Sequence, residues 1–213
     1  MLLKNLIRLL PKNIKGINIK NLSLDSRSTK KGDLFFAIKG HKLNGENFIK
    51  EAERKGAKAI VCSINLKKNK SNIPVIRVKD TREALAFACK NFYRDKPKNI
   101  IAVTGTNGKS SVADFFHQIL TANSIPVATI GTLGIKKNKK IKKINLTSPN
   151  IILLHRELAE LKKNKIDNVI IEASSHGLHQ KRLNEINIKA GIFTNFSQDH
   201  LDYHKTMKNY FNS

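Results

Sequence analysis

The sequence has no apolar run of the roughly 20 residues that a membrane-spanning helix needs. Its amino-terminal hydrophobic stretch is short, because Arg8 and Pro11 interrupt it, and no small-residue cleavage site follows. Both absences argue against a membrane-inserted protein and against a secretory signal peptide. We therefore expect a cytoplasmic protein without membrane insertion.

Cysteine is scarce as well. Cys62 and Cys89 are the only two in 213 residues, and each lies in an apolar stretch without the spacing of metal ligands. This scarcity argues against a disulfide framework and against a cysteine-based metal centre. We predict that both are small buried hydrophobic residues in a reducing compartment.

Acidic residues are few, with 16 Asp and Glu against 40 Lys and Arg, so the formal net charge is +24. Such an excess can serve nucleic-acid binding by neutralising phosphates. The lysines are scattered, however, and the densest run, at residues 136–143, has no aromatic side chains that could stack on bases. We interpret this run as a solvated loop, and we expect weak, salt-sensitive adhesion to polyanions rather than specific nucleic-acid binding.

The pattern of apolar residues divides the chain into two α/β domains, and the boundary lies in the polar, proline-containing segment 95–98. The first domain, residues 1–97, is small. Its strands are predicted at residues 34–38, 57–61 and 75–78, and its helices at 46–55 and 81–93. Asp80 or Thr81 is the predicted cap of the second helix.

The second domain, residues 98–213, alternates strand, loop and helix, which indicates a mostly parallel sheet with helices on its faces. In such a sheet, ligands bind at the carboxyl ends of the strands. Strands are predicted at 99–104, 127–130, 168–172 and 190–193, and helices at 110–122 and 150–164. Residues 209–213 resemble part of an amphipathic helix without a cap, so we expect that the chain is truncated.

The strand at 99–104 leads directly into a glycine-rich loop that contains a lysine. Glycines let backbone N–H groups approach phosphate oxygens, the lysine neutralises the β- and γ-phosphates, and a hydroxyl after it can ligate Mg²⁺. The helix that follows adds a dipole that favours anions. Val103 is a departure, because a glycine is usual there. We predict an ATP site in this variant loop, formed by Gly105, Thr106, Asn107, Gly108, Lys109, Ser110 and Ser111.

Polar side chains also follow two other predicted strands. Glu172 ends the strand at 168–172, where a carboxylate can reach a phosphate-bound Mg²⁺ or serve as a simple cap. The segment 173–182 is a polar turn or part of a ligand site, and we favour the ligand site because a buried strand delivers it. A third cluster either binds metal or is structural, and it contains Asp199, His200, Asp202 and His204.

Together these motifs resemble those of the Mur ligases. The resemblance rests on residues 105–110, on Glu172 with Ser174-Ser175-His176-Gly177-Leu178, on Gln180 and Arg182, and on residues 195–204. In the first domain, residues 24–27, 32–37 and 40–41 are similar to the uridine-nucleotide domain of that family. The phosphate loop alone would also fit folylpolyglutamate or cyanophycin synthetases, and the segment 174–182 narrows the choice.

The resemblance implies roles for particular residues. Lys109, Glu172 and His200 would be catalytic, with Lys109 on the ATP phosphates. Two Mg²⁺ ions would be held by Ser110, Glu172 and His200. The UDP-linked substrate would be bound by Leu24, Ser26, His41, Thr147, Ser148, Ser174, Gln180 and Arg182. Ser148 departs from the family's Thr-Thr-Pro motif but keeps the hydroxyl.

The resemblance also implies a reaction, the ATP-dependent addition of a diamino acid to UDP-N-acetylmuramoyl-L-alanyl-D-glutamate in peptidoglycan synthesis. The substrate carboxylate would attack the γ-phosphate, and the amine of diaminopimelate or lysine would then attack the acyl phosphate. The family's carbamylated lysine would fall just after Ser213, and its carboxyl-terminal domain lies outside this chain, so we expect a monomeric fragment with little activity alone. A non-catalytic nucleotide-sugar-binding module and another Mur-type ligase stay open as alternatives.

Overall fold

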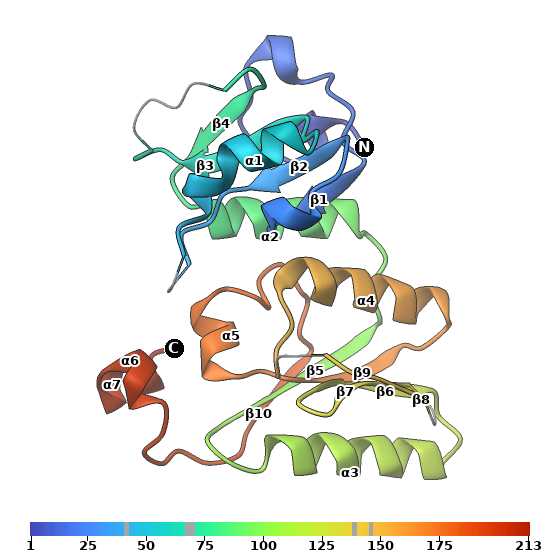
Figure 1. The fold of residues 1–213 in the computed structure, drawn as a ribbon. Helices are drawn as coiled ribbons and strands as arrows, with labels where there is room; N and C mark the ends of the chain where they lie inside the picture. The colour runs from blue at the N-terminus through green and yellow to red at the C-terminus, as the bar shows by residue number, and fades with distance from the viewer. Residues whose placement is uncertain (41–42, 67–70, 138–139, 145–146) are drawn as a thin grey trace. The chain divides into compact units, whose positions relative to one another are not determined.

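The computed structural model describes residues 1–40, 43–66, 71–137, 140–144 and 147–213. The chain folds into two compact units, Met1–Phe92 and Tyr93–Ser213, and each unit has its own sheet (Figure 1). Helices accompany both sheets, so the α/β fold class is confirmed. No helix in the described ranges is both long and apolar enough to span a membrane.

The first unit contains a four-stranded parallel sheet in the order β1-β2-β3-β4. Its strands are β1 Asn21–Ser23, β2 Asp33–Phe36, β3 Ala59–Ser63 and β4 Val75–Val78. Its helices are α1 Ile49–Arg54 and α2 Thr81–Phe92, together with the short 3-10 helices η1 Leu3–Asn5, η2 Lys12–Ile14, η3 Ser26–Ser28 and η4 Gly45–Phe48. The sequence did not reveal β1, because three residues are too few to show an alternating pattern.

Apolar side chains of β2, β3 and α1 form a core of this unit, which includes Phe35, Ile49 and Ile60. Cys62 belongs to the same core, and both it and Cys89 are buried, as predicted. The single helix predicted at 46–55 is wrong in detail, since the chain forms η4 first and α1 begins only at Ile49.

The start of α2 agrees with the sequence prediction. Asp80 Oδ1 accepts hydrogen bonds from the backbone N–H groups of Arg82, at 2.8 Å, and Glu83, at 3.1 Å. Asp80 therefore caps the helix, because it satisfies two N–H groups that have no partner within the helix.

The second unit contains a six-stranded sheet in the order β10-β5-β9-β6-β7-β8. Its strands are β5 Asn99–Thr104, β6 Val127–Gly131, β7 Gly134–Lys137, β8 Lys140–Lys142, β9 Asn168–Glu172 and β10 Ala190–Phe193. Its helices are α3 Lys109–Ala122, α4 Ile151–Lys163, α5 Ser175–His179, α6 Leu201–His204 and α7 Met207–Phe211. The first four strands in the sheet order are parallel, so the predicted mostly parallel sheet is confirmed.

The interpretation of residues 136–143 as a loop is wrong. Most of this run lies in β7 and β8, which pair antiparallel, and β7 pairs antiparallel with β6. Ile135 anchors the hairpin because it is buried opposite Ile130 of β6. The residues of β8 are exposed, so its lysines remain solvated even though the backbone is extended. Residues 138–139 lie outside the described part of the chain.

Helices α3 and α4 cover opposite faces of this sheet (Figure 1). Leu154, Leu158 and Leu161 of α4 are spaced by four and three residues, so they share one face of the helix, and they belong to the core that contains Ile130 and Ile171 of the sheet. The carboxyl ends of β5, β6, β9 and β10 all point to one edge, because these strands are parallel. The loops that follow them therefore converge.

Candidate functional site

The phosphate-type loop joins β5 to α3 at this converging edge. Gly108, the residue directly before α3, has φ +85°, a conformation that glycine adopts without strain. Gly105 has φ +130°, and a Cβ there would collide with the Thr194 hydroxyl. The first turn of α3 presents backbone N–H groups that have no partner within the helix, and these groups favour an anion.

The Lys109 ammonium lies over the loop. Its Nζ donates to the carbonyl oxygen of Gly105 at 2.7 Å and to that of Thr106 at 2.8 Å. Burial lowers the pKa of Lys109 from its usual value, while the carboxylates of Glu172 and Asp199 act in the opposite direction. A phosphate at this position would compete with the two carbonyl oxygens and would form a charge-assisted hydrogen bond.

Glu172 ends β9 and is 3% exposed. Its Oε2 accepts hydrogen bonds from Ser110 Oγ at 2.8 Å and from Thr132 Oγ1 at 2.9 Å, and its Oε1 accepts one from the Thr132 N–H at 3.1 Å. Gly131 makes room for the side chain, because a Cβ there would collide with the carboxylate. Among the described residues, no basic side chain forms an ion pair with Glu172, so a buried negative charge is available to a cation.

The segment after β10 holds the phosphate-type loop from the other side. The backbone N–H of Thr106 donates to the Asn195 carbonyl oxygen, and that of Asn107 donates to Asn195 Oδ1, each at 3.0 Å. Thr194 Oγ1 donates to the Asn107 carbonyl oxygen at 2.6 Å. These contacts hold the loop, and Asn195 belongs to residues 195–204, on which the family resemblance partly rested.

Serine hydroxyls and a guanidinium extend the site away from the loop. Ser148 is 1% exposed, and its Oγ donates to the Glu172 carbonyl oxygen at 2.9 Å and accepts from the Ser174 N–H at 3.0 Å. The Ser174 hydroxyl lies 3.0 Å from the Ser148 hydroxyl. Arg182 Nη1 donates to the Ser148 carbonyl oxygen at 2.6 Å. Thr147 joins the group, because its Oγ1 lies 3.1 Å from Thr132 Oγ1.

These groups line a single cavity of about 460 Å³. It brings together most of the residues that the sequence indicated for this unit, and Gln180 stands behind it, bonded to Arg182. The sequence analysis did not assign Thr132 or Tyr210 to the site, and it included Ser175 and His176 only as members of the segment 173–182 that it favoured as part of a ligand site. The lining consists of Gly105, Thr106, Asn107, Gly108, Lys109, Ser110, Ser111, Thr132, Thr147, Ser148, Glu172, Ser174, Ser175, His176, Arg182, His200 and Tyr210.

Of the residues that were missed, Thr132 carried a usable signal. It directly follows β6, a parallel strand, and the argument that identified Glu172 at the end of β9 applies to it equally. Tyr210 carried no such signal, since it lies on α7, far along the chain from any strand end. Only the folding of α7 back onto the loop places it in the cavity lining.

The donor set at Ser110 and Glu172 suits magnesium. Mg²⁺ usually takes one or two carboxylates from a protein and completes its shell with water and substrate phosphates. His200 lines the same cavity. The alternative metal site formed by residues 199, 200, 202 and 204 is wrong, since no group of three or more His, Cys, Asp or Glu side chains in the described ranges can hold a metal ion. His204 is instead buried with Nε2 3.0 Å from Ser175 Oγ.

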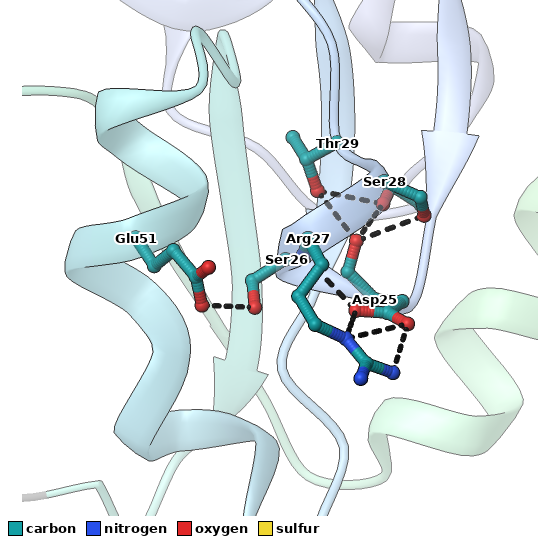
Figure 2. A network of polar contacts seen from close by, with 7 residues as sticks. Asp25, Ser26, Arg27, Ser28, Thr29 and Glu51 are labelled. Carbon is teal, nitrogen blue, oxygen red and sulfur yellow. Dashed lines mark hydrogen bonds and ion pairs between the residues drawn. The ribbon is translucent and has the colours of Figure 1, made fainter.

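In the first unit, Leu24 lies in the turn that leads into η3, and Ser26 is the first residue of η3. Asp25 caps this 3-10 helix by accepting from the Arg27 N–H at 3.0 Å, and its carboxylate also accepts from the Arg27 guanidinium (Figure 2). Ser26 Oγ donates to Glu51 Oε2 of α1 at 2.5 Å (Figure 2). The turn is therefore tied both to itself and to α1. His41, the third predicted contact here, lies outside the described residues.

Two family models match the chain. Residues 18–93 match the model described as the Mur ligase family catalytic domain, and residues 103–213 match the model described as the Mur ligase middle domain. The two matches together cover most of the sequence.

Two similar curated relatives carry the same name, UDP-N-acetylmuramoyl-L-alanyl-D-glutamate–2,6-diaminopimelate ligase. The Brucella melitensis protein is 41% identical over 95% of this chain and 41% of its own length, and the Rickettsia conorii protein is 44% identical over 91% and 41%. A solved structure with the same name matches the whole chain and 43% of its own, with 26% identity and a TM-score of 0.86. The chain therefore spans about two fifths of the length of these relatives.

Proposed function

This chain belongs to the Mur ligase family, and we propose that it forms the substrate-binding and ATP-binding parts of a ligase that extends the peptide of UDP-N-acetylmuramoyl-L-alanyl-D-glutamate. The observation that carries the proposal is the single cavity in the second unit. A lysine-bearing phosphate loop lies at one end, Arg182 and the serines 148 and 174 lie at the other, and the buried carboxylate of Glu172 lies between them.

The two ends of this cavity suit the two substrates of a phosphoryl transfer. At the loop, Lys109 and the N–H groups of α3 would bind the ATP phosphates. At the other end, Thr147, Ser148, Ser174 and Arg182, with Gln180 behind them, would bind the sugar and peptide of the second substrate. The substrate carboxylate would then lie near the γ-phosphate.

The first unit would bind the uridine nucleotide through Leu24, Ser26 and His41. Ser26 supports this role, because its hydroxyl proton is already donated to Glu51, so the oxygen is left to accept a hydrogen bond from a ligand. Glu51 fixes that orientation from α1.

The proposed reaction has two steps that balance. A carboxylate oxygen of the substrate attacks the γ-phosphorus of ATP, and ADP leaves as the acyl phosphate forms. The amine nitrogen of the incoming amino acid then attacks the acyl carbon, phosphate leaves, and the nitrogen loses a proton. Lys109 would neutralise charge on the transferring phosphoryl group.

Mg²⁺ would supply further neutralisation of the phosphate charge when bound. Ser110, Glu172 and His200 are the residues that we propose would hold it. The Ser110 hydroxyl is oriented by Glu172, so a cation between them would displace one hydrogen bond and gain a full negative charge as ligand.

The amino acid that we propose is diaminopimelate, because the relatives that are 41% and 44% identical carry it in their names. Lysine remains the alternative to test. Either amino acid would bind in a part of the ligase outside these 213 residues. An activity assay with each amino acid would therefore distinguish the two.

Binding and turnover test the proposal separately. Calorimetry of the 213-residue chain should show binding of ATP with Mg²⁺ and of UDP-N-acetylmuramoyl-L-alanyl-D-glutamate. A protein that carries this chain at the full length of its relatives should release phosphate only when ATP, the UDP-linked substrate and diaminopimelate are all present. Binding of the UDP-linked substrate without any binding of ATP would favour the non-catalytic module. Binding of neither would reject the proposal.

A further inference from the structure

Two tyrosines of the helical segment 201–211 contact the site at different places: Tyr210 lines the cavity, and Tyr203 lies behind it, against Gln180. Tyr203 lies on α6 and Tyr210 on α7, with Phe196 and His204 packed against the Tyr210 ring at centroid distances of 5.2 Å each. Figure 1 shows α6 and α7 together, beyond the end of β10. Their hydroxyl groups point to different partners, so the segment contacts both halves of the proposed site.

Tyr210 contacts the phosphate loop. It is 7% exposed, and its hydroxyl lies 3.1 Å from Thr106 Oγ1. Thr106 Oγ1 also accepts from the Ser197 N–H at 3.0 Å. The Thr106 side chain is therefore held by α7 and by the segment after β10 at the same time. Thr106 lies in the loop that joins β5 to the first turn of α3, so its side-chain contacts hold that loop and help to fix the direction of the N–H groups at the start of the helix.

Tyr203 contacts the other end through Gln180. Arg182 donates from Nε and Nη2 to Gln180 Oε1, at 3.2 and 2.8 Å, and a guanidinium can only donate, so this atom is the amide oxygen. Gln180 Nε2 must then donate to the Tyr203 hydroxyl oxygen, at 3.1 Å. The same hydroxyl lies 2.9 Å from His179 Nδ1, which completes a chain from His179 to the guanidinium.

The directions of the bonds between Arg182, Gln180 and Tyr203 fix the orientation of the Gln180 amide. The Tyr203 oxygen accepts from Gln180, and its contact with His179 Nδ1 is compatible with either direction of donation. If the Gln180 amide were flipped, its NH₂ group would face the N–H groups of Arg182, and these hydrogen bonds would be lost. Arg182 is thus fixed on one side by Gln180 and on the other by the Ser148 carbonyl oxygen.

From this we infer that Tyr203 and Tyr210 are positioning residues, with Tyr210 fixing the phosphate loop through Thr106 and Tyr203 fixing Arg182 through Gln180. Neither needs to touch a reacting atom. The names of the ligands at the two ends rest on the proposed function, but the two contacts do not. Groups that are held before a ligand arrives lose less freedom on binding, which raises affinity.

The direct test is amide hydrogen exchange on the ligand-free chain, read by mass spectrometry, for Tyr210→Phe and Tyr203→Phe. Each substitution removes one hydroxyl and keeps the ring that packs in the cluster. Tyr210→Phe should speed exchange in the peptide covering residues 105–108 about threefold to tenfold, as the loss of one hydrogen bond predicts. Tyr203→Phe should speed exchange by a similar factor in the peptide covering residues 179–182. Tyr93→Phe is the matched control, because it removes the third tyrosine hydroxyl from a residue that lies outside both the cavity lining and the segment 201–211.

Selectivity decides the outcome. Each variant should affect its own segment and leave the other segment unchanged, with thermal unfolding close to that of the wild type. Equal acceleration of both segments by either variant would mean a general loss of packing and would overturn the inference. Unchanged exchange in both variants would overturn it as well.

Ligand affinity supplies the functional arm. Tyr210→Phe should weaken ATP binding, with Mg²⁺ present, about threefold to tenfold while the affinity for UDP-N-acetylmuramoyl-L-alanyl-D-glutamate is retained, and Tyr203→Phe should do the reverse. A wild-type chain that binds neither ligand rejects the proposed function, and the exchange data then decide the positioning roles alone. A chain that binds both ligands with the same affinity in all variants refutes the positioning roles and leaves the proposed function intact.

Discussion

Ser110 Oγ donates a hydrogen bond to Glu172 Oε2 across 2.8 Å, although 62 positions separate the two residues in the sequence. The contact exists because β5 and β9 are neighbouring parallel strands, and α3 starts just after the first while Glu172 ends the second. The Ser110 hydroxyl and the buried Glu172 carboxylate therefore meet at the N-terminus of α3. This pair is the centre of the proposed cation site.

Replacement of the carboxylate tests that site. Glu172→Gln keeps the volume and removes the charge, so the Mg²⁺-dependent part of ATP affinity should fall at least about tenfold. Calorimetry with Mg²⁺ and with a chelator measures that part. Glu160→Gln is the control, because it removes the same charge from an exposed position of α4. An unchanged magnesium dependence in Glu172→Gln would remove Glu172 from the cation site.

Removal of the lysine tests the phosphate loop. Lys109→Ala should lower ATP affinity roughly tenfold to a hundredfold, since it deletes a charge-assisted contact to phosphate. The matched change is Lys163→Ala, at an exposed residue in the last turn of α4. The two variants have the same net charge, so a loss seen only in Lys109→Ala is local. If both variants bind ATP like the wild type, the loop is not a phosphate site.

Removal of one hydroxyl tests the uridine site of the first unit. Ser26→Ala should weaken binding of UDP about fivefold and reduce the rise in melting temperature that UDP causes. Ser28→Ala is the neighbouring control, because the Ser28 hydroxyl is exposed and donates to the Asp25 carbonyl oxygen. UDP binding should not depend on ATP. Equal effects of the two substitutions would be evidence that Ser26 makes no contact with the nucleotide.

A buried histidine predicts how stability depends on pH. Burial lowers the pKa of His155 from 6.5 to about 4, and the nearby Lys96 ammonium adds to this effect, while the Asn184 carbonyl oxygen and Glu185 oppose it. In the described structure its Nδ1 has no hydrogen-bond partner. The unfolded chain therefore binds a proton more readily than the folded chain between these two pH values.

The sign follows from that difference. The stability contributed by neutral His155 is fully present above about pH 6.5 and is lost as the pH falls from there to about 4, by on the order of 3 kcal/mol. Urea unfolding of the wild type and of His155→Gln, at several pH values, measures the loss as a difference, which cancels the contributions of other histidines. Parallel stability curves for the two proteins would falsify this assignment.

Much of the fold could be predicted because the relevant signals are local. Runs of apolar residues predicted the strands at 99–104, 168–172 and 190–193. A capping residue predicted the helix that begins at Thr81. The hairpin of β7 and β8 was not legible, because its lysine-rich sequence has the composition of a loop and only pairing with β6 gives it extended structure. The division of residues 45–54 into η4 and α1 also depends on contacts outside the segment.

The sequence by itself determined the chemical groups of the second unit's site. A glycine-rich loop with Lys109 and a glutamate at the end of a strand are local patterns, and their chemistry can be recognised without knowledge of the fold. The tertiary structure alone decided which of them meet. It brought Thr132 to Glu172, turned α7 back so that Tyr210 reaches Thr106, and directed His204 to Ser175 instead of a metal. Such pairings depend on strand order and on side-chain direction over long separations. A one-dimensional pattern carries neither.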